Sequence, residues 1–115
     1  MVVIEKELLQ YEKGHIKYCI NIPKIYNKEK NDKDFIQNKM IESINQIILE
    51  DIITFMDVVE DSYKISSSDY THISSLTEFQ VGYDSKDIIS LSIEFSQLEV
   101  FYDISYLKGY NYDFK

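Results

Sequence analysis

Apolar residues recur at three- and four-residue intervals through the middle of the chain, in residues 35–60. The stretch contains neither glycine nor proline, and its apolar positions are Ile36, Met40, Ile44, Ile47, Ile48, Ile52, Phe55, Met56 and Val59. This spacing places them on one side of an α-helix. Polar and acidic residues occupy the other side, namely Asn38, Glu42, Asn45, Glu50, Asp57 and Asp61. We therefore predict one long amphipathic helix with a buried apolar stripe and an acidic face in water.

The segments on both sides of this helix alternate apolar and polar residues, which is the period of strands with one buried face. Before the helix, residues 2–11 and 16–22 are separated by a break at Gly14 and predict a hairpin. After it, residues 77–83 and 88–95 are joined by a short polar turn and predict a second hairpin. A last strand is predicted where Tyr110, Tyr112 and Phe114 share one face.

The predicted element order is strand, strand, helix and three further strands. One helix packed on an antiparallel sheet of about five strands buries both apolar surfaces in two layers, so the expected fold class is α+β. The chain has 115 residues. Because single cores span about 50–200 residues, we expect residues 1–115 to form one domain.

The charge balance narrows the range of partners. All basic residues are lysine, and the formal net charge is −8 with a pI near 4.6. We expect no nucleic-acid partner, because binding to a phosphate backbone relies on clustered positive side chains. We expect a protein partner, and the negative charge favours a basic one. No apolar run reaches the length of a membrane helix, so no membrane segment is expected in this chain.

The residues that usually carry chemistry are sparse. Cys19 is the only cysteine, and His15 and His72 lack the spacing of a helical metal-binding pair. No serine stands in a Gly-x-Ser-x-Gly motif, and three glycines leave no phosphate-binding loop. We therefore expect no enzyme activity, no metal and no cofactor. A hydrolase that uses His72 and neighbouring carboxylates is the competing hypothesis.

The C-terminal end of the chain is rich in aromatic residues. Because successive residues of a strand face opposite ways, these rings cannot all enter one core, and tyrosine is enriched at protein interfaces. We expect some of the rings to pack beneath the helix and the rest to form an exposed tyrosine-rich surface. The candidate binding residues are these tyrosines and three helix carboxylates: Tyr102, Tyr106, Tyr110, Tyr112, Asp57, Glu60 and Asp61.

The order of these segments resembles a bacterial cell-envelope domain of unknown function. That family occurs at the N-terminal side of PdaC-type peptidoglycan deacetylases and in RsiV-type anti-sigma factors. The resemblance rests on Ile20-Asn21-Ile22-Pro23-Lys24-Ile25, on Ile44-Asn45, on Ile88-Ile89-Ser90-Leu91-Ser92-Ile93 and on the closing Tyr110-Asn111-Tyr112-Asp113-Phe114-Lys115. The chain departs from the family in residues 96–108, where a glycine-rich turn with Ala-His is common.

The resemblance implies a non-catalytic binding or sensory module, with no catalytic residue to carry over. A protein or cell-wall ligand would be recognised through the tyrosine-rich sheet surface and the acidic helix face. The alternative is a small intracellular inhibitor or immunity-type protein that blocks a basic enzyme. The compartment is extracytoplasmic if a leader was trimmed, and cytoplasmic if Met1 is the native start. An uncovered sheet edge would also allow two copies to pair as a homodimer.

Overall fold

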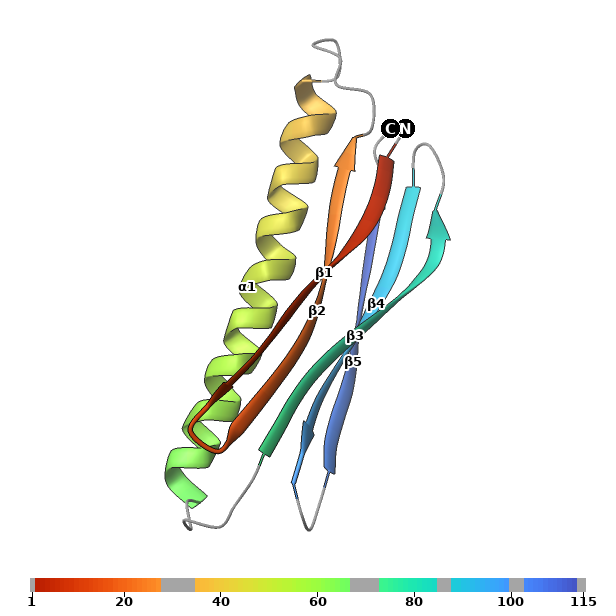
Figure 1. Ribbon diagram of the computed structural model, residues 1–115. Coiled ribbons are helices and arrows are strands. Elements are labelled where there is room, and N and C mark those ends of the chain that lie inside the picture. Colours follow the sequence, from red (N-terminus) through yellow and green to blue (C-terminus); the bar gives the residue numbers. More distant parts are fainter. Residues whose placement is uncertain (1, 28–34, 67–72, 85–87, 100–102, 114–115) are drawn as a thin grey trace.

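The computed structural model describes residues 2–27, 35–66, 73–84, 88–99 and 103–113. These residues form one helix that lies against one face of a five-stranded sheet (Figure 1). In chain order the elements are β1 (Val2–Lys13), β2 (Ile16–Asn27), α1 (Phe35–Ser66), β3 (Ile73–Asp84), β4 (Ile88–Leu98) and β5 (Asp103–Asp113). The predicted α+β fold and the predicted order of elements are confirmed.

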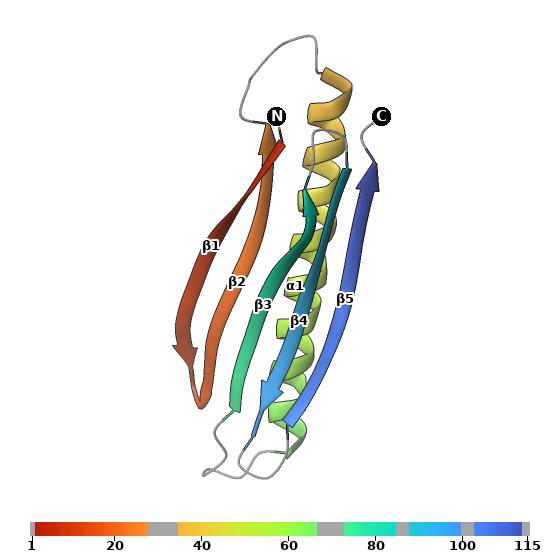
Figure 2. The same ribbon diagram turned by 90° about the vertical axis from the view of Figure 1, so that its right-hand side faces the viewer.

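The strands lie side by side in sequence order, from β1 at one edge to β5 at the other (Figure 2). Neighbouring strands are antiparallel except for β2 and β3, which are parallel. The expectation of a wholly antiparallel sheet is therefore corrected at this junction. Parallel neighbours need a crossover connection, and α1 supplies it by returning the chain along the sheet before β3 begins.

The helix α1 is longer than its pattern predicted, since it runs for 32 residues and ends at Ser66. At ~1.5 Å per residue this corresponds to about 48 Å. The molecule measures 55 × 22 × 18 Å, and its radius of gyration of 16.6 Å exceeds the about 13 Å usual for a chain of this size. Among the described residues, no helix combines the length and the apolarity that crossing a membrane requires.

The hydrophobic core lies between α1 and the sheet. The helix contributes Ile41, Ile44, Ile48, Ile52, Phe55 and Val59, all of them buried. Facing them are apolar residues of the inner strands, chiefly Ile16, Tyr18, Ile20, Ile73, Leu91, Ile93 and Phe95. The backbone of α1 approaches β2 most closely and then β3. The core is therefore centred on the β2 side of the sheet.

This position leaves part of the predicted apolar stripe uncovered. Ile36, Met40 and Ile47 were expected in the core, but they are 76%, 36% and 44% exposed. They lie on the flank of α1 that faces β5, where the helix does not rest closely on the sheet. The apolar stripe of α1 is thus wider than the part of the sheet that covers it.

The β1–β2 hairpin closes as the sequence predicts. Lys13 pairs with Ile16, which leaves Gly14 and His15 as a two-residue loop. Gly14 has a φ of 61° and is the one residue with positive φ among those described. A positive φ at the first loop position is the type II′ arrangement, which matches the twist of a hairpin and favours glycine.

β2 and β3 pair along only part of their length. The pairing runs from Ile16↔Ile73 to Ile20↔Thr77, and beyond it the two strands diverge (Figure 2). At the fork, the Thr77 hydroxyl accepts a hydrogen bond from the Asn21 N–H and donates one to the Asn21 carbonyl, both at 2.9 Å. The Asn21 side chain donates to the Thr77 carbonyl at 2.8 Å. These contacts end the shared ladder without leaving its last backbone groups unpaired.

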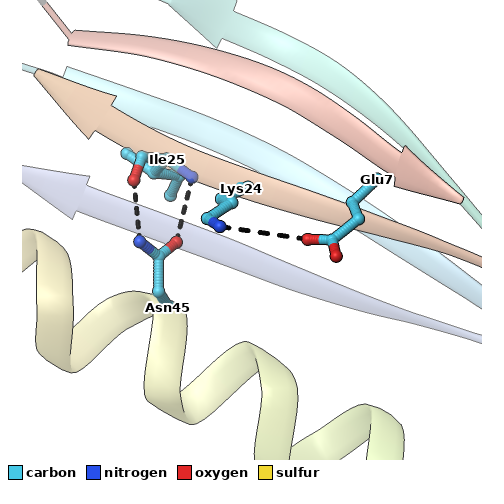
Figure 3. Close-up of polar contacts among 4 residues, drawn as sticks. All are labelled: Glu7, Lys24, Ile25 and Asn45. Carbon is cyan, nitrogen blue, oxygen red and sulfur yellow. Dashed lines mark hydrogen bonds and ion pairs between the residues drawn. The ribbon is translucent and has the colours of Figure 1, made fainter.

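Past the fork, a helix side chain takes the place of a neighbouring strand. Asn45 Oδ1 accepts a hydrogen bond from the Ile25 N–H at 2.9 Å, and its Nδ2 donates to the Ile25 carbonyl at 2.7 Å (Figure 3). On the other side β2 stays paired with β1, where Lys24 lies 4.0 Å from Glu7. The prediction that Asn45 belongs to the water-facing side of the helix was wrong, because the free edge of β2 lies opposite it.

Candidate functional site

Exposed apolar residues line both sides of the gap between α1 and β5. The helix contributes Ile36, Met40, Ile47 and Val58, and the strand contributes Ile104, Tyr106 and Tyr112. We call this surface the α1–β5 seam. It exists because β5 lies at the sheet edge farthest from β1, while α1 packs over β2 and β3. Alternation along β5 then directs its even-numbered residues toward the helix.

Two hollows lie along the seam. The first, of about 330 Å³, is bordered by Phe55, Val58, Phe95, Gln97, Ile104 and Tyr106. The second, of about 410 Å³, is bordered by Ile36, Met40, Ser43, Ile44, Ile47 and Tyr112. Both hollows are lined largely by apolar side chains. Their volumes lie near the lower end of the roughly 300–1,000 Å³ that is usual for ligand-binding clefts.

Three stacked and edge-on rings form the wall of the first hollow. Phe95 and Tyr106 stack with centroids 4.9 Å apart, and Phe55 meets Phe95 edge-on at 5.2 Å. Phe55 also approaches Tyr106 edge-on at 6.1 Å. Such contacts add about 0.5–1.5 kcal/mol per pair beyond area burial, so the three rings hold one another in place.

A polar cluster separates the two hollows. Asp51 Oδ2 accepts hydrogen bonds from the Lys108 ammonium at 2.6 Å and from the Tyr110 hydroxyl at 2.7 Å. The Lys108 ammonium also lies 5.4 Å from the centroid of the Tyr110 ring. These contacts connect the middle of α1 to the edge strand. They hold β5 beside the helix, whose closest backbone approaches are to β2 and β3.

The electrostatics of the cluster keep Asp51 ionised and Tyr110 protonated near neutral pH. Burial opposes ionisation of Asp51, but the hydrogen bonds from Lys108 and Tyr110 outweigh it, so the Asp51 pKa is lowered. Burial and the bond to Asp51 raise the pKa of Tyr110. A proton-transfer catalyst needs a pKa near the working pH, and both shifts move away from neutrality. The cluster is therefore suited to holding structure.

The seam collects three of the predicted tyrosines in unequal roles. Tyr110 is buried and bound to Asp51, Tyr112 is half-buried, and Tyr106 remains exposed at 49%. Burial raises the pKa of Tyr106 and of Tyr112, so both hydroxyls stay protonated at neutral pH. Tyr102 lies outside the described residues. The expected tyrosine surface thus lies on the helix-facing side of β5. Tyr110 is packed beneath this surface and is not exposed on it.

The predicted helix carboxylates do not gather with these tyrosines. Glu60 accepts a hydrogen bond from the Lys13 ammonium at 2.7 Å, which raises the pKa of Lys13. Lys13 belongs to β1, so Glu60 lies on the flank of α1 opposite the seam. Asp57 and Asp61 are exposed on the outer side of the helix. Among the six predicted residues that the structure describes, the three helix carboxylates therefore lie apart from the three tyrosines.

The residues that build the seam were partly visible in the sequence. Asp51 falls between the core positions Ile48 and Phe55, and Lys108 falls within the alternating tyrosines of β5. A single charge inside an apolar pattern is a signal for a paired charge. The choice of partner for each charge depends on how α1 and β5 are placed relative to each other. No local sequence pattern gives that placement.

The hydrolase hypothesis depends on His72, which lies outside the described residues. His15 is half-buried in the hairpin loop. Within the described ranges, no three His, Cys, Asp or Glu side chains come together as metal ligands. Cys19 is a half-buried free thiol in β2.

The fold resembles one solved structure from a bacterial family of unknown function. That structure is a crystal structure of a DUF3298 family member from Bacteroides fragilis, with a TM-score of 0.51 and 12% sequence identity. The match covers 96% of this chain and 56% of that chain, so this chain spans about half the length of that protein. The sequence matches no family model and no curated protein. At this identity the likeness shows a shared fold, and it agrees with the bacterial domain of unknown function indicated by the sequence.

Proposed function

We propose that this chain is a non-catalytic module that recognises another polypeptide through the α1–β5 seam. The observation that carries the proposal is the row of exposed apolar residues, 36% to 76% exposed, beside the last strand of the sheet. Contiguous apolar surface of this kind marks interaction sites in soluble domains. An edge strand beside it offers backbone groups for pairing.

The composition of the seam supports a polypeptide partner. Its two hollows present Tyr106, Met40, Val58 and Ile104, and the paired charges of Asp51 and Lys108 lie between them. Aromatic residues and methionine are enriched in protein interfaces. Of the protein and cell-wall ligands implied by the resemblance, the seam favours the protein, because exposed apolar side chains form much of its surface and the second hollow is lined mainly by apolar residues.

The state of the polar groups supports a non-catalytic role. The most densely hydrogen-bonded ionisable cluster in the seam is Asp51 with Lys108 and Tyr110, in which the charges of Asp51 and Lys108 neutralise each other. We further propose that the module is of the bacterial cell-envelope type. The sequence resemblance and the fold shared with the DUF3298 member support that assignment.

The test is a selection of random displayed peptides on the immobilised protein, followed by affinity measurements on two matched variants. Val58→Asp places a charge in the seam at a position that is 55% exposed, and Ile53→Asp places one outside the seam at a position that is 47% exposed. The two positions lie roughly 140° apart around the helix axis. Selected peptides should bind the Ile53→Asp protein normally and lose about tenfold or more in affinity for the Val58→Asp protein.

Circular dichroism and thermal melting should show that both variants fold, since both side chains already face water. Peptides that bind all three proteins equally, or a selection that yields no binder, would contradict recognition through the seam.

A further inference from the structure

We propose that the partner of the seam is an extended segment carrying basic residues, which adds to the edge of β5 as a further strand. This inference rests on the proposed function and makes it specific. It is drawn from the free edge of β5, from the position of the hollows beside it and from the distribution of charge along it.

The backbone of β5 is open to strand addition. β5 has 11 residues, and among the described strands its one neighbour is β4. The ladder with β4 extends over the whole strand, from Ile88↔Asp113 to Leu98↔Asp103. At ~3.4 Å per residue the free edge is about 37 Å long. Partners that add a strand obtain affinity from such backbone groups and specificity from pockets for alternate side chains.

The hollows lie where alternate side chains of an added strand would fall. One hollow is beside Ile104 and Tyr106 near the start of β5, and the other is beside Tyr112 near its end. Between them stands Lys108, already bound to Asp51. Successive side chains on one face of a strand are about 7 Å apart. An added segment would therefore place aliphatic residues over both hollows and a small polar residue at the centre.

Charge determines which extended segment is favoured. On the face of the sheet away from α1, Asp103 and Glu94 lie near the start and the middle of the β5 edge, and Asp113 lies at its end. The exposed outer side of α1 adds Glu50, Asp57 and Asp61. The lysines described near the seam are Lys108, bound to Asp51, and Lys39, which lies 3.7 Å from Glu42. A segment with lysine or arginine at both ends complements this pattern and the net charge of −8.

The same charges disfavour a second copy of this chain. Two β5 strands paired antiparallel over their whole length would be centred on Lys108. Lys108 would then face Lys108, and Asp103 would face Asp113. Like charges directly opposite each other destabilise a strand pair. Each copy also carries the net charge of −8, which adds long-range repulsion.

The experiment uses two synthetic peptides as long as β5, 11 residues. One alternates threonine with valine and isoleucine, has serine at its centre and carries a lysine at each end. Its counterpart is identical except for a glutamate at each end. The pattern reads the same in both directions, so it fits parallel or antiparallel addition. At low salt the lysine peptide should bind about tenfold or more tightly than the glutamate peptide, and high salt should reduce the difference.

The strand geometry is tested by amide hydrogen exchange on the isotope-labelled protein. With the lysine peptide bound, β5 amides should gain protection, while amides of β1 at the opposite edge should not. Val58→Asp should weaken binding about tenfold and Ile53→Asp should not. Ile104→Lys, at a position that is 50% exposed, provides a second disruption from the strand side.

The outcomes separate the two proposals. Equal affinity for the two peptides overturns the basic partner, and binding without protection of β5 overturns strand addition. Either result leaves the proposed function standing if randomly selected peptides still depend on Val58. If the selected peptides do not depend on Val58 either, the proposed function fails as well.

Discussion

Two hydroxyl groups of β3 lie two residues apart and are both fully buried, but they differ in hydrogen bonding. Thr77 Oγ1 exchanges hydrogen bonds with the backbone of Asn21, whereas Ser75 Oγ has no partner. Thr77→Val should lower the free energy of unfolding by about 1–3 kcal/mol, because it leaves the Asn21 N–H buried and unpaired. Ser75→Ala removes a group that gained nothing on burial, so it should be neutral or slightly stabilising.

Urea denaturation of the two variants checks this contrast, and each serves as the control for the other. A Ser75→Ala protein destabilised as much as Thr77→Val would show that the Ser75 hydroxyl has a partner after all. Equal m-values would confirm that both variants unfold from a comparable native state.

Asp51 links stability to pH in a defined direction. Its pKa in the folded protein is lowered, so its contribution is present above the unfolded-state pKa of 3.8 and is lost as the pH falls through the folded-state value. Asp51→Asn should cost about 1 kcal/mol near neutral pH, because charge-assisted bonds from Lys108 and Tyr110 become weaker. The difference between the two proteins should shrink toward zero well below pH 3.8.

Denaturation of both proteins across the acid range measures that difference directly. Tyr110→Phe is the matched control, since it removes one bond to Asp51 and keeps the carboxylate and its bond from Lys108. A difference between wild type and Asp51→Asn that stays constant with pH would contradict the role given to the ionised carboxylate.

At the scale of elements, strong periodicity was sufficient to identify the helix and the strands. The three- and four-residue spacing located α1, and strict alternation located β4 and the start of β2. The ends were less well defined, because α1 continues to Ser66 through residues without a clear apolar period. The parallel pairing of β2 with β3 could not be read from periodicity, since it depends on which strand β3 docks beside after α1 returns the chain along the sheet.

Two adjacent isoleucines measure how far the apolar stripe of α1 exceeds the core. Ile48 is 0% exposed and Ile47 is 44% exposed. Ile48→Ala should lower the free energy of unfolding by about 2–5 kcal/mol, because it leaves a cavity in the core. Ile47→Ala should cost well under about 1 kcal/mol, since it removes a side chain half in water.

The pair also tests the position of the helix over the sheet. Chemical denaturation gives both values, and each substitution removes the same atoms from the same helix. Equal losses would place Ile47 in the core, as the sequence pattern predicted, and would remove one wall of the second hollow.

At the scale of the whole molecule, the sequence predicted the ingredients of the seam but not their assembly. Alternation indicated that Tyr110, Tyr112 and Phe114 share a face. Tyr110 and Tyr112 do, Phe114 lies outside the described residues, and Tyr106 shares the face as well because β5 begins at Asp103. Their meeting with Asp51 and Val58 could not be predicted, because it follows from a helix placed over β2 and β3 in a sheet of five strands. Helical and strand periods define faces, and only the packing of the layers decides which faces are covered.

The net charge opposes self-association of the molecule, whereas the free edge of β5 favours it. Sedimentation velocity can decide which effect prevails. Near neutral pH the charge of −8 should keep the protein monomeric, because close approach of two copies is repulsive and two β5 strands paired antiparallel over their whole length oppose like charges. Near the pI of about 4.6 the repulsion vanishes, and the exposed seam should then drive association. Val58→Asp should reduce that association and Ile53→Asp should not. A dimer at neutral pH that Val58→Asp dissociates would instead make a second copy the occupant of the seam.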